Sequence, residues 1–161
     1  MDPFLDSTEP LEPADAVAAL IVTADGRYLL QQRDNQSRIL YPGHWGLFGG
    51  AIEAGETEAA ALCRELDEEL GLAVTDSGYF TRFDFDMAFC GRGRLRRVFY
   101  EVPIEAAAVG DLRLNEGAGH GLWRARQALA ELRLTPYDGF ALWLHSSRAR
   151  LSAGPSAGRR P

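Results

Sequence analysis

The sequence predicts an α/β fold, specifically an α/β/α sandwich with a mixed β-sheet between an acidic helix and a C-terminal helix. Three observations support this prediction. Residues 59–70 have the apolar periodicity of an amphipathic helix, apolar runs typical of strands precede and follow it, and residues 136–145 form a second, mostly apolar helical segment. A chain of 161 residues can form one domain with a sizeable core.

The first elements in chain order are an arm and a hairpin. Residues 1–13 contain three prolines and four acidic residues without periodicity, which predicts a flexible N-terminal arm. Residues 16–23 and 28–33 are apolar runs separated by Asp25-Gly26, a dipeptide typical of tight hairpin turns. Arg33 ends the second run, and a polar loop follows it.

The acidic helix is the best-defined element. Thr57 is a favourable N-cap, and Gly71 follows the segment where a left-handed residue commonly ends a helix. At roughly 100° per residue, the leucines of this segment share one arc. A neighbouring arc carries three carboxylates spaced i, i+3 and i+4, namely Glu65, Glu68 and Glu69. The helix is therefore expected to pack by its leucines and to present three carboxylates side by side.

The charge of this region needs an explanation. Residues 50–72 contain seven acidic residues and one basic residue, Arg64. Like charges one helical turn apart repel each other, so a neutralising partner is expected. Oxygen-only clusters suit hard divalent cations such as Mg²⁺, with Mn²⁺ as an alternative. An ordinary solvated acidic helix face is the competing interpretation.

The second half of the chain completes the sandwich. Residues 72–88 and 95–104 are predicted strands joined by a turn at 90–93, and a glycine-rich loop at 112–121 leads to a short final strand. Residues 124–132 and 136–145 are predicted helices, the second with Thr135 at the N-cap and Pro136 at its first position. Residues 14–146 are therefore expected to form one domain, and residues 147–161 a disordered tail.

Composition excludes several functional classes. The net charge of −6 argues against a general nucleic-acid or membrane-surface binder. All seventeen basic residues are arginine, which excludes chemistry that depends on a P-loop or Schiff-base lysine. Two distant cysteines make no disulfide framework, and no apolar run has the length of a transmembrane span. A cytoplasmic protein is therefore expected.

The spacing of residues within 50–72 resembles the signature of the Nudix hydrolase family. Gly50, Glu56 and the run from Arg64 to Leu72, RELDEELGL, occupy every fixed position of that signature. The resemblance extends over residues 14–145 and implies the Nudix sandwich described above. It also implies divalent-metal-dependent hydrolysis of a nucleoside diphosphate linked to a moiety X.

The resemblance assigns roles to individual residues. The implied metal ligands are the carbonyl of Gly49 and the carboxylates of Glu65, Glu68 and Glu69. Glu116, in the glycine-rich loop, resembles a glutamate that joins these three in catalysis in MutT-like members. Arg33 and Asp138 are the implied substrate contacts. Four residues are implied to be structural: Gly50, Glu56, Arg64 and Gly71. The proline that usually precedes the two glycines is Phe48 here.

Several substrates and one other function remain open at this level. The short chain favours a MutT-type nucleoside triphosphate, with nucleotide sugars or ADP-ribose as alternatives. A Nudix-fold sensor that binds a nucleotide without cleaving it is the alternative of another class. An isopentenyl-diphosphate-type isomerase is disfavoured because such enzymes use a cysteine upstream of the motif, which this chain lacks. The expected partner is a small nucleotide, and a homodimer is left open.

Overall fold

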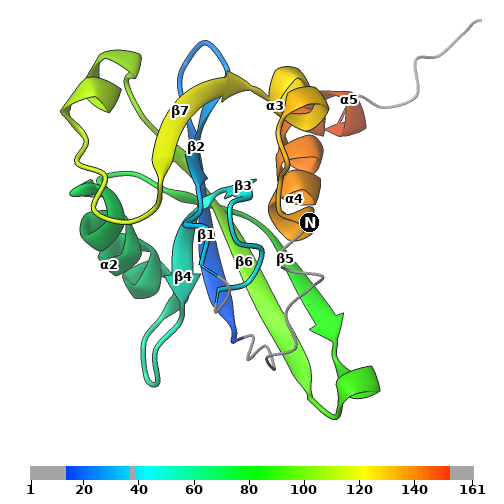
Figure 1. The fold of residues 1–161 in the computed structure, drawn as a ribbon. Coiled ribbons are helices and arrows are strands. Elements are labelled where there is room, and N and C mark those ends of the chain that lie inside the picture. The colour runs from blue at the N-terminus through cyan, green and yellow to red at the C-terminus, as the bar shows by residue number, and fades with distance from the viewer. Residues whose placement is uncertain (1–13, 37–38, 153–161) are drawn as a thin grey trace, which may run out of the picture.

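A mixed sheet forms the centre of the computed structural model, which describes residues 14–36 and 39–152 (Figure 1). Its hydrogen-bonded order is β3-β2-β1-β6-β5, and β4 and β7 pair with β1 and β2. The strands are β1 (Ala16–Val22), β2 (Arg27–Gln32), β3 (Trp45–Gly46), β4 (Phe48–Ala51), β5 (Gly78–Asp86), β6 (Arg94–Pro103) and β7 (Gly119–Arg124). β1 and β6 run parallel, and the other pairs are antiparallel.

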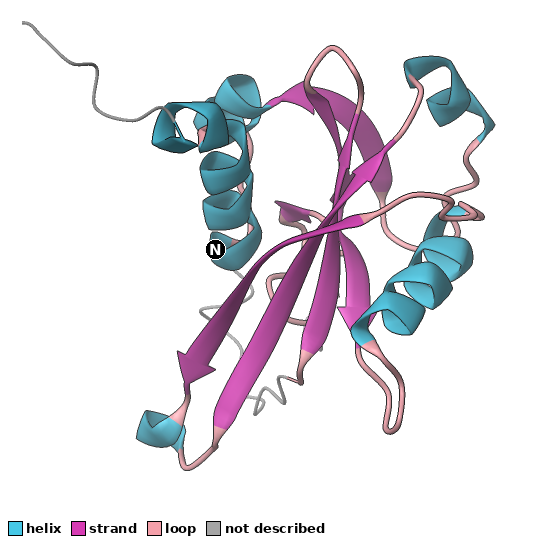
Figure 2. Ribbon diagram, turned by 180° about the vertical axis from the view of Figure 1, so that it is seen from behind, coloured by secondary structure: helices cyan, strands magenta, loops and turns pink. Residues whose placement is uncertain are grey.

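Helices cover both faces of this sheet. They are α2 (Glu58–Leu70), α3 (Ala125–Glu131), α4 (Pro136–Ser146) and α5 (Arg148–Ser152), with 3₁₀ turns at η1 (Ala88–Cys90) and η2 (Ala106–Asp111). α2 lies on one face, whereas α3 and α4 lie on the other (Figures 1 and 2). The predicted α/β/α sandwich is therefore confirmed. None of the helices in the described ranges is long and apolar enough to cross a membrane.

The central strand β1 supplies the core of both layers. Residues 17–21 are fully buried. Val17, Ala19 and Ile21 belong to the core cluster under α2, whereas Ala18 and Leu20 belong to the cluster under α4. A strand covered on both faces is expected to be apolar at every position, as this one is.

α2 begins and ends where the sequence predicts. The Thr57 hydroxyl accepts a hydrogen bond from the Ala60 amide at 3.1 Å, and Gly71 adopts the left-handed conformation with φ +63°. Three leucines of the predicted arc, Leu62, Leu66 and Leu70, are fully buried against the sheet. The position of the acidic arc is fixed by this packing.

Some predicted boundaries are wrong. Residues 72–77 are not a strand; they carry the chain from α2 towards the sheet edge, with Leu72 and Val74 packed on the core. β3 and β4 were not predicted. Thr135 occupies the N-cap position of α4, but its side chain makes no capping hydrogen bond. Residues 148–152 are helical instead of disordered, whereas the predicted arm and residues 153–161 lie outside the described residues.

Candidate functional site

The centre of the site is Glu69, in the last turn of α2. Its side chain is buried, with 6% of the residue exposed. One carboxylate oxygen accepts a hydrogen bond from the Gly49 amide at 2.9 Å, and the other lies 3.5 Å from the Gln31 amide nitrogen. The C-terminal end of a helix disfavours negative charge, and the last turn of α2 carries no basic residue. Glu69 is therefore an acid in a place that opposes its ionisation.

The pKa values of Glu65 and Glu69 reflect this unfavourable environment for negative charge. The pKa of Glu69 is raised to about 7, mainly by burial and also by the charges of Glu65 and Glu116, while the hydrogen bonds from Gly49 and Gln31 act to lower it. Burial also raises the pKa of Glu65, against a lowering by its hydrogen bond from Arg64. Carboxylates that raise one another's pKa in a partly buried corner are a common feature of functional sites.

Arg64 holds the loop before α2 against the helix. Its Nε and Nη2 atoms each lie 2.9 Å from an oxygen of Glu56, and Nη2 also donates to the Ala51 carbonyl at 2.9 Å. Its Nη1 atom donates to Glu65 at 2.7 Å and to Glu68 at 3.3 Å. Because two of the three carboxylates share one nitrogen, they lie close to each other.

Two glycines shape the floor of the cluster. Gly49 has φ +138°, and a Cβ there would lie 2.1 Å from the Val17 carbonyl oxygen, so only glycine fits. A Cβ on Gly50 would lie 2.5 Å from the Glu65 carboxylate. Phe48, which stands where the family usually has proline, is fully buried in the core under α2. The phenylalanine at this position thus contributes to the hydrophobic core under α2.

The loop before β7 brings a fourth carboxylate to the cluster. The Asn115 backbone amide donates to the Glu69 carbonyl at 2.9 Å, and its side-chain amide donates to the Glu68 carbonyl at 2.8 Å. These bonds satisfy carbonyls at the end of α2. They also hold the exposed Glu116 close enough to raise the pKa of Glu65 and Glu69.

The carboxylates of Glu65, Glu68, Glu69 and Glu116 have the chemistry to bind a hard divalent cation, but their oxygens do not converge on one position. The residues are all oxygen donors, and their mutual repulsion would be relieved by a cation. Among the described residues, however, no group of three or more acidic, histidine or cysteine side chains converges on a common centre. Glu65 and Glu68 face Arg64 instead. The side chain of Glu68 is 56% exposed, so its contact with Arg64 is open to solvent.

Asp138, at the N-terminal end of α4, lies on the opposite face of the sheet. It is 1% exposed, and one oxygen pairs with Arg97 at 3.0 Å while the other accepts a hydrogen bond from the Leu47 amide at 3.0 Å. The Arg97 guanidinium also lies over the Tyr137 ring, 4.0 Å from its centroid. Both oxygens of Asp138 are thus occupied by the protein.

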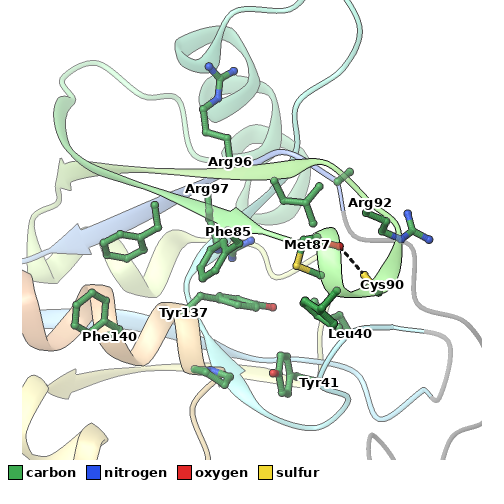
Figure 3. A pocket seen from close by; sticks show the side chains of 15 residues that line it. Leu40, Tyr41, Phe85, Met87, Cys90, Arg92, Arg96, Arg97, Tyr137 and Phe140 are labelled. Carbon is green, nitrogen blue, oxygen red and sulfur yellow. Dashed lines mark hydrogen bonds between the residues drawn. The ribbon is translucent and has the colours of Figure 1, made fainter.

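An apolar cleft of about 990 Å³ opens beside this ion pair (Figure 3). Its walls come from α4, the β5–β6 hairpin and the loop before β3, and its lining includes Tyr41, Phe83, Phe85, Tyr137 and Phe140. Arg33 lies near it: its Nε donates to the Leu40 carbonyl at 3.0 Å, and its charge acts to lower the pKa of Tyr137, which burial raises overall. Arg33 and Asp138 therefore lie at the same end of the sheet.

A single segment connects the cleft with the carboxylate cluster. Trp45 accepts a hydrogen bond from the Thr135 amide at 2.8 Å, which places the start of α4 beside this segment. Two residues later the Leu47 amide binds Asp138, and two residues after that the Gly49 amide binds Glu69. An elongated ligand with an aromatic end and an anionic end could contact both parts through this segment.

Three contributing residues were not identified from the sequence. Gln31 is buried in β2 and donates to the Leu47 carbonyl at 3.1 Å as well as facing Glu69. Because Gln31 is a polar residue in a mostly apolar strand, the sequence could have indicated a functional role for it. Arg97 and Asn115 gave no comparable signal, since exposed strands and loops commonly carry such residues.

Comparisons with known proteins show which family this chain resembles. The family described as NUDIX domain matches residues 12–145. A nucleoside triphosphatase NudI from Enterobacter sp. is 33% identical over 119 residues, covering 71% of this chain and 84% of the relative. A putative 8-oxo-dGTP diphosphatase 2 from Mycobacterium tuberculosis is 54% identical over 54 residues, but the match spans only 34% of this chain and 38% of that relative.

A solved structure agrees with the fold as well. The MutT NUDIX hydrolase of Burkholderia pseudomallei superposes with a TM-score of 0.63 at 29% identity, covering 82% of this chain and 97% of that one.

Proposed function

The chain belongs to the NUDIX domain family and is a Nudix-type hydrolase, and from this premise we propose that its substrate is a nucleoside triphosphate. In this proposal it cleaves the pyrophosphate linkage and releases a nucleoside monophosphate. The observation that carries the proposal is Glu69, a buried motif carboxylate whose pKa lies near 7 beside Glu65 and Glu116. The names of the relatives support a triphosphate, because one is named a nucleoside triphosphatase and the other a putative 8-oxo-dGTP diphosphatase.

The proposed cation is Mg²⁺, with Mn²⁺ as an alternative, held by Glu65, Glu68, Glu69 and the Gly49 carbonyl. When bound, such an ion lowers the pKa of a water molecule and neutralises charge on phosphate oxygens. The chain itself would supply a carboxylate, either Glu65 or Glu116, to orient or deprotonate the attacking water. The Glu56–Arg64 pair keeps the loop and helix in register, so that these groups meet the substrate in a fixed geometry.

In the same proposal the nucleobase enters the aromatic cleft. Tyr137 offers a ring face, and the buried Asp138 keeps Arg97 against it instead of contacting the base directly. This assigns Asp138 a positioning role in place of the direct base contact inferred from resemblance. Arg33, near Tyr137, is proposed to contact the substrate between base and phosphates.

The experiment is a Mg²⁺-dependent hydrolysis screen over nucleoside triphosphates, including oxidised ones, together with ADP-ribose and nucleotide sugars. Glu69→Gln removes the proposed ligand, whereas Asp67→Asn changes an exposed acid of the same helix and is the matched control. The proposal requires triphosphate cleavage by the wild type and the control but not by Glu69→Gln. Cleavage of ADP-ribose or sugar nucleotides alone would reassign the substrate, and binding without cleavage would indicate a sensor.

A further inference from the structure

The cleft beside Tyr137 continues past the place proposed for a nucleobase. Where β5 pairs with β6, Phe83 lies opposite Arg97, the residue whose guanidinium lies over Tyr137. Phe85 lies opposite Leu95, two residues nearer the hairpin turn. At about 3.4 Å per residue, the wall of the cleft therefore extends about 7 Å beyond the contact between Arg97 and Tyr137. A base at Tyr137 would leave this outer part unfilled, and the cleft volume of about 990 Å³ is large enough for a drug-sized ligand.

Apolar side chains from two parts of the chain line the outer part of the cleft. Phe85 and Met87 come from the β5–β6 hairpin and Leu40 from the loop before β3, and Figure 3 shows them around one space. Phe85 is 39% exposed, although its ring continues a row that begins with Phe99 and Phe83, with centroid separations of 5.2 Å and 6.4 Å. Methionine adapts its shape to different ligands, and covering exposed apolar surface is favourable. An apolar group of a ligand would therefore be stabilised here.

The cleft offers few partners to a polar or charged group. Among the described residues that line it, none is acidic, and three are arginines. Arg97 is paired with the buried Asp138 at 3.0 Å, and Arg96 points away from the cleft in Figure 3 and pairs with Glu58 at 3.4 Å. The third, Arg92, also has a partner. A polar group placed here would lose its water without gaining equivalent hydrogen bonds, so the outer part favours an uncharged, apolar occupant.

The outer part lies beyond the base site as seen from the carboxylate cluster. Gly49 lies level with Phe99 of β6, because both are opposite Ala18 of β1. Arg97 lies two residues nearer the hairpin turn than Phe99, and Leu95 two residues nearer still. A group attached to the phosphates would have to pass the base to reach the outer part, whereas a group attached to the base would lie next to it.

We propose that this outer part binds a bulky apolar substituent carried on the base, so that the substrate is a nucleoside triphosphate modified in this way. The inference rests on the proposed function, which puts the base at Tyr137 and the phosphates near Gly49. The substituent lies along Phe85 and Met87, with Leu40 on its other side. An aromatic ring joined to the base through one carbon has a suitable length and chemistry for this wall.

Binding of nucleoside monophosphates tests the site independently of hydrolysis, because these compounds contain no pyrophosphate bond. Isothermal titration calorimetry on the full chain with Mg²⁺ would compare N6-benzyl-AMP with AMP and O6-benzyl-GMP with GMP. Phe85→Ser removes apolar surface from the hairpin wall, and Leu40→Ser does so from the opposite wall. Tyr79→Ser is the matched control, because Tyr79 is a 61% exposed aromatic residue of the same strand that does not line this cleft.

The benzyl compound of at least one pair should bind the wild type and Tyr79→Ser at least about tenfold more tightly than its unsubstituted partner. Phe85→Ser and Leu40→Ser should each reduce this preference at least about threefold. Equal affinities within both pairs, weaker binding of the benzyl compounds, or no binding at all would overturn the proposal. A preference that both cleft variants leave unchanged would also overturn it. A preference with the expected losses in a chain that cleaves no triphosphate would support the site and contradict the proposed function.

Discussion

Replacing Glu69 by glutamine should stabilise the metal-free protein while removing its activity. The pKa of Glu69 is about 7 in the folded protein and 4.5 ordinarily. Because the folded state holds this proton more tightly than the unfolded chain, metal-free stability falls as the pH rises from about 4.5 to about 7. That difference is worth about 3 kcal/mol once the pH is above 7. Glutamine is neutral and keeps an oxygen for the Gly49 amide.

Urea and thermal unfolding with EDTA, at pH 5 and pH 8, would measure this effect. At pH 8 the Glu69→Gln protein should be more stable by up to about 3 kcal/mol, or roughly 6–12 °C in Tm for a chain of this size. At pH 5 the difference should shrink to less than about 1 kcal/mol, and saturating Mg²⁺ should stabilise the wild type but not Glu69→Gln. Asp67→Asn should match the wild type within about 0.5 kcal/mol. Lower stability of Glu69→Gln at pH 8, or a difference independent of pH, would refute the reasoning.

Three further predictions concern other parts of the site. Gly50→Ala should cost less than about 1 kcal/mol, because a flexible carboxylate gives way to its Cβ, but it should slow hydrolysis about 100-fold by displacing that carboxylate. Arg97→Met should cost about 3–5 kcal/mol in urea unfolding by leaving the buried Asp138 unpaired, and adding Asp138→Asn should recover part of it. Burial lowers the pKa of His145, so in the Glu69→Gln protein Tm should fall as the pH drops below about 6.5; a flat profile would contradict this.

The parts of the fold set by local sequence were predictable. The Thr57 cap, the Gly71 terminus and the apolar arc between them fix α2 through interactions within one element and its packing face. The hairpin at Gly26, which has φ +81°, likewise depends on a local backbone preference. The leucine spacing therefore predicted correctly which face of α2 packs on the sheet.

The contacts that complete the site depend on distant segments. Asp138 meets Arg97 across 41 residues and the Leu47 amide across 91, so nothing near it in the sequence indicates that both of its oxygens are occupied. β4 is a four-residue strand with two glycines, whose pairing with β1 comes from tertiary context instead of propensity. The rotation of Glu65 towards Arg64 is also a tertiary outcome, since the sequence shows only that the two are adjacent.

Binding of Mn²⁺, followed by electron paramagnetic resonance in the absence of nucleotide, tests most directly whether the carboxylates at the end of α2 hold a divalent cation. The wild type and Asp67→Asn should remove free Mn²⁺ from solution with the same affinity. Glu69→Gln should bind at least about tenfold more weakly, since a lost charged ligand costs more than 1.4 kcal/mol. Equal affinity in all three proteins would contradict a metal site built on Glu69.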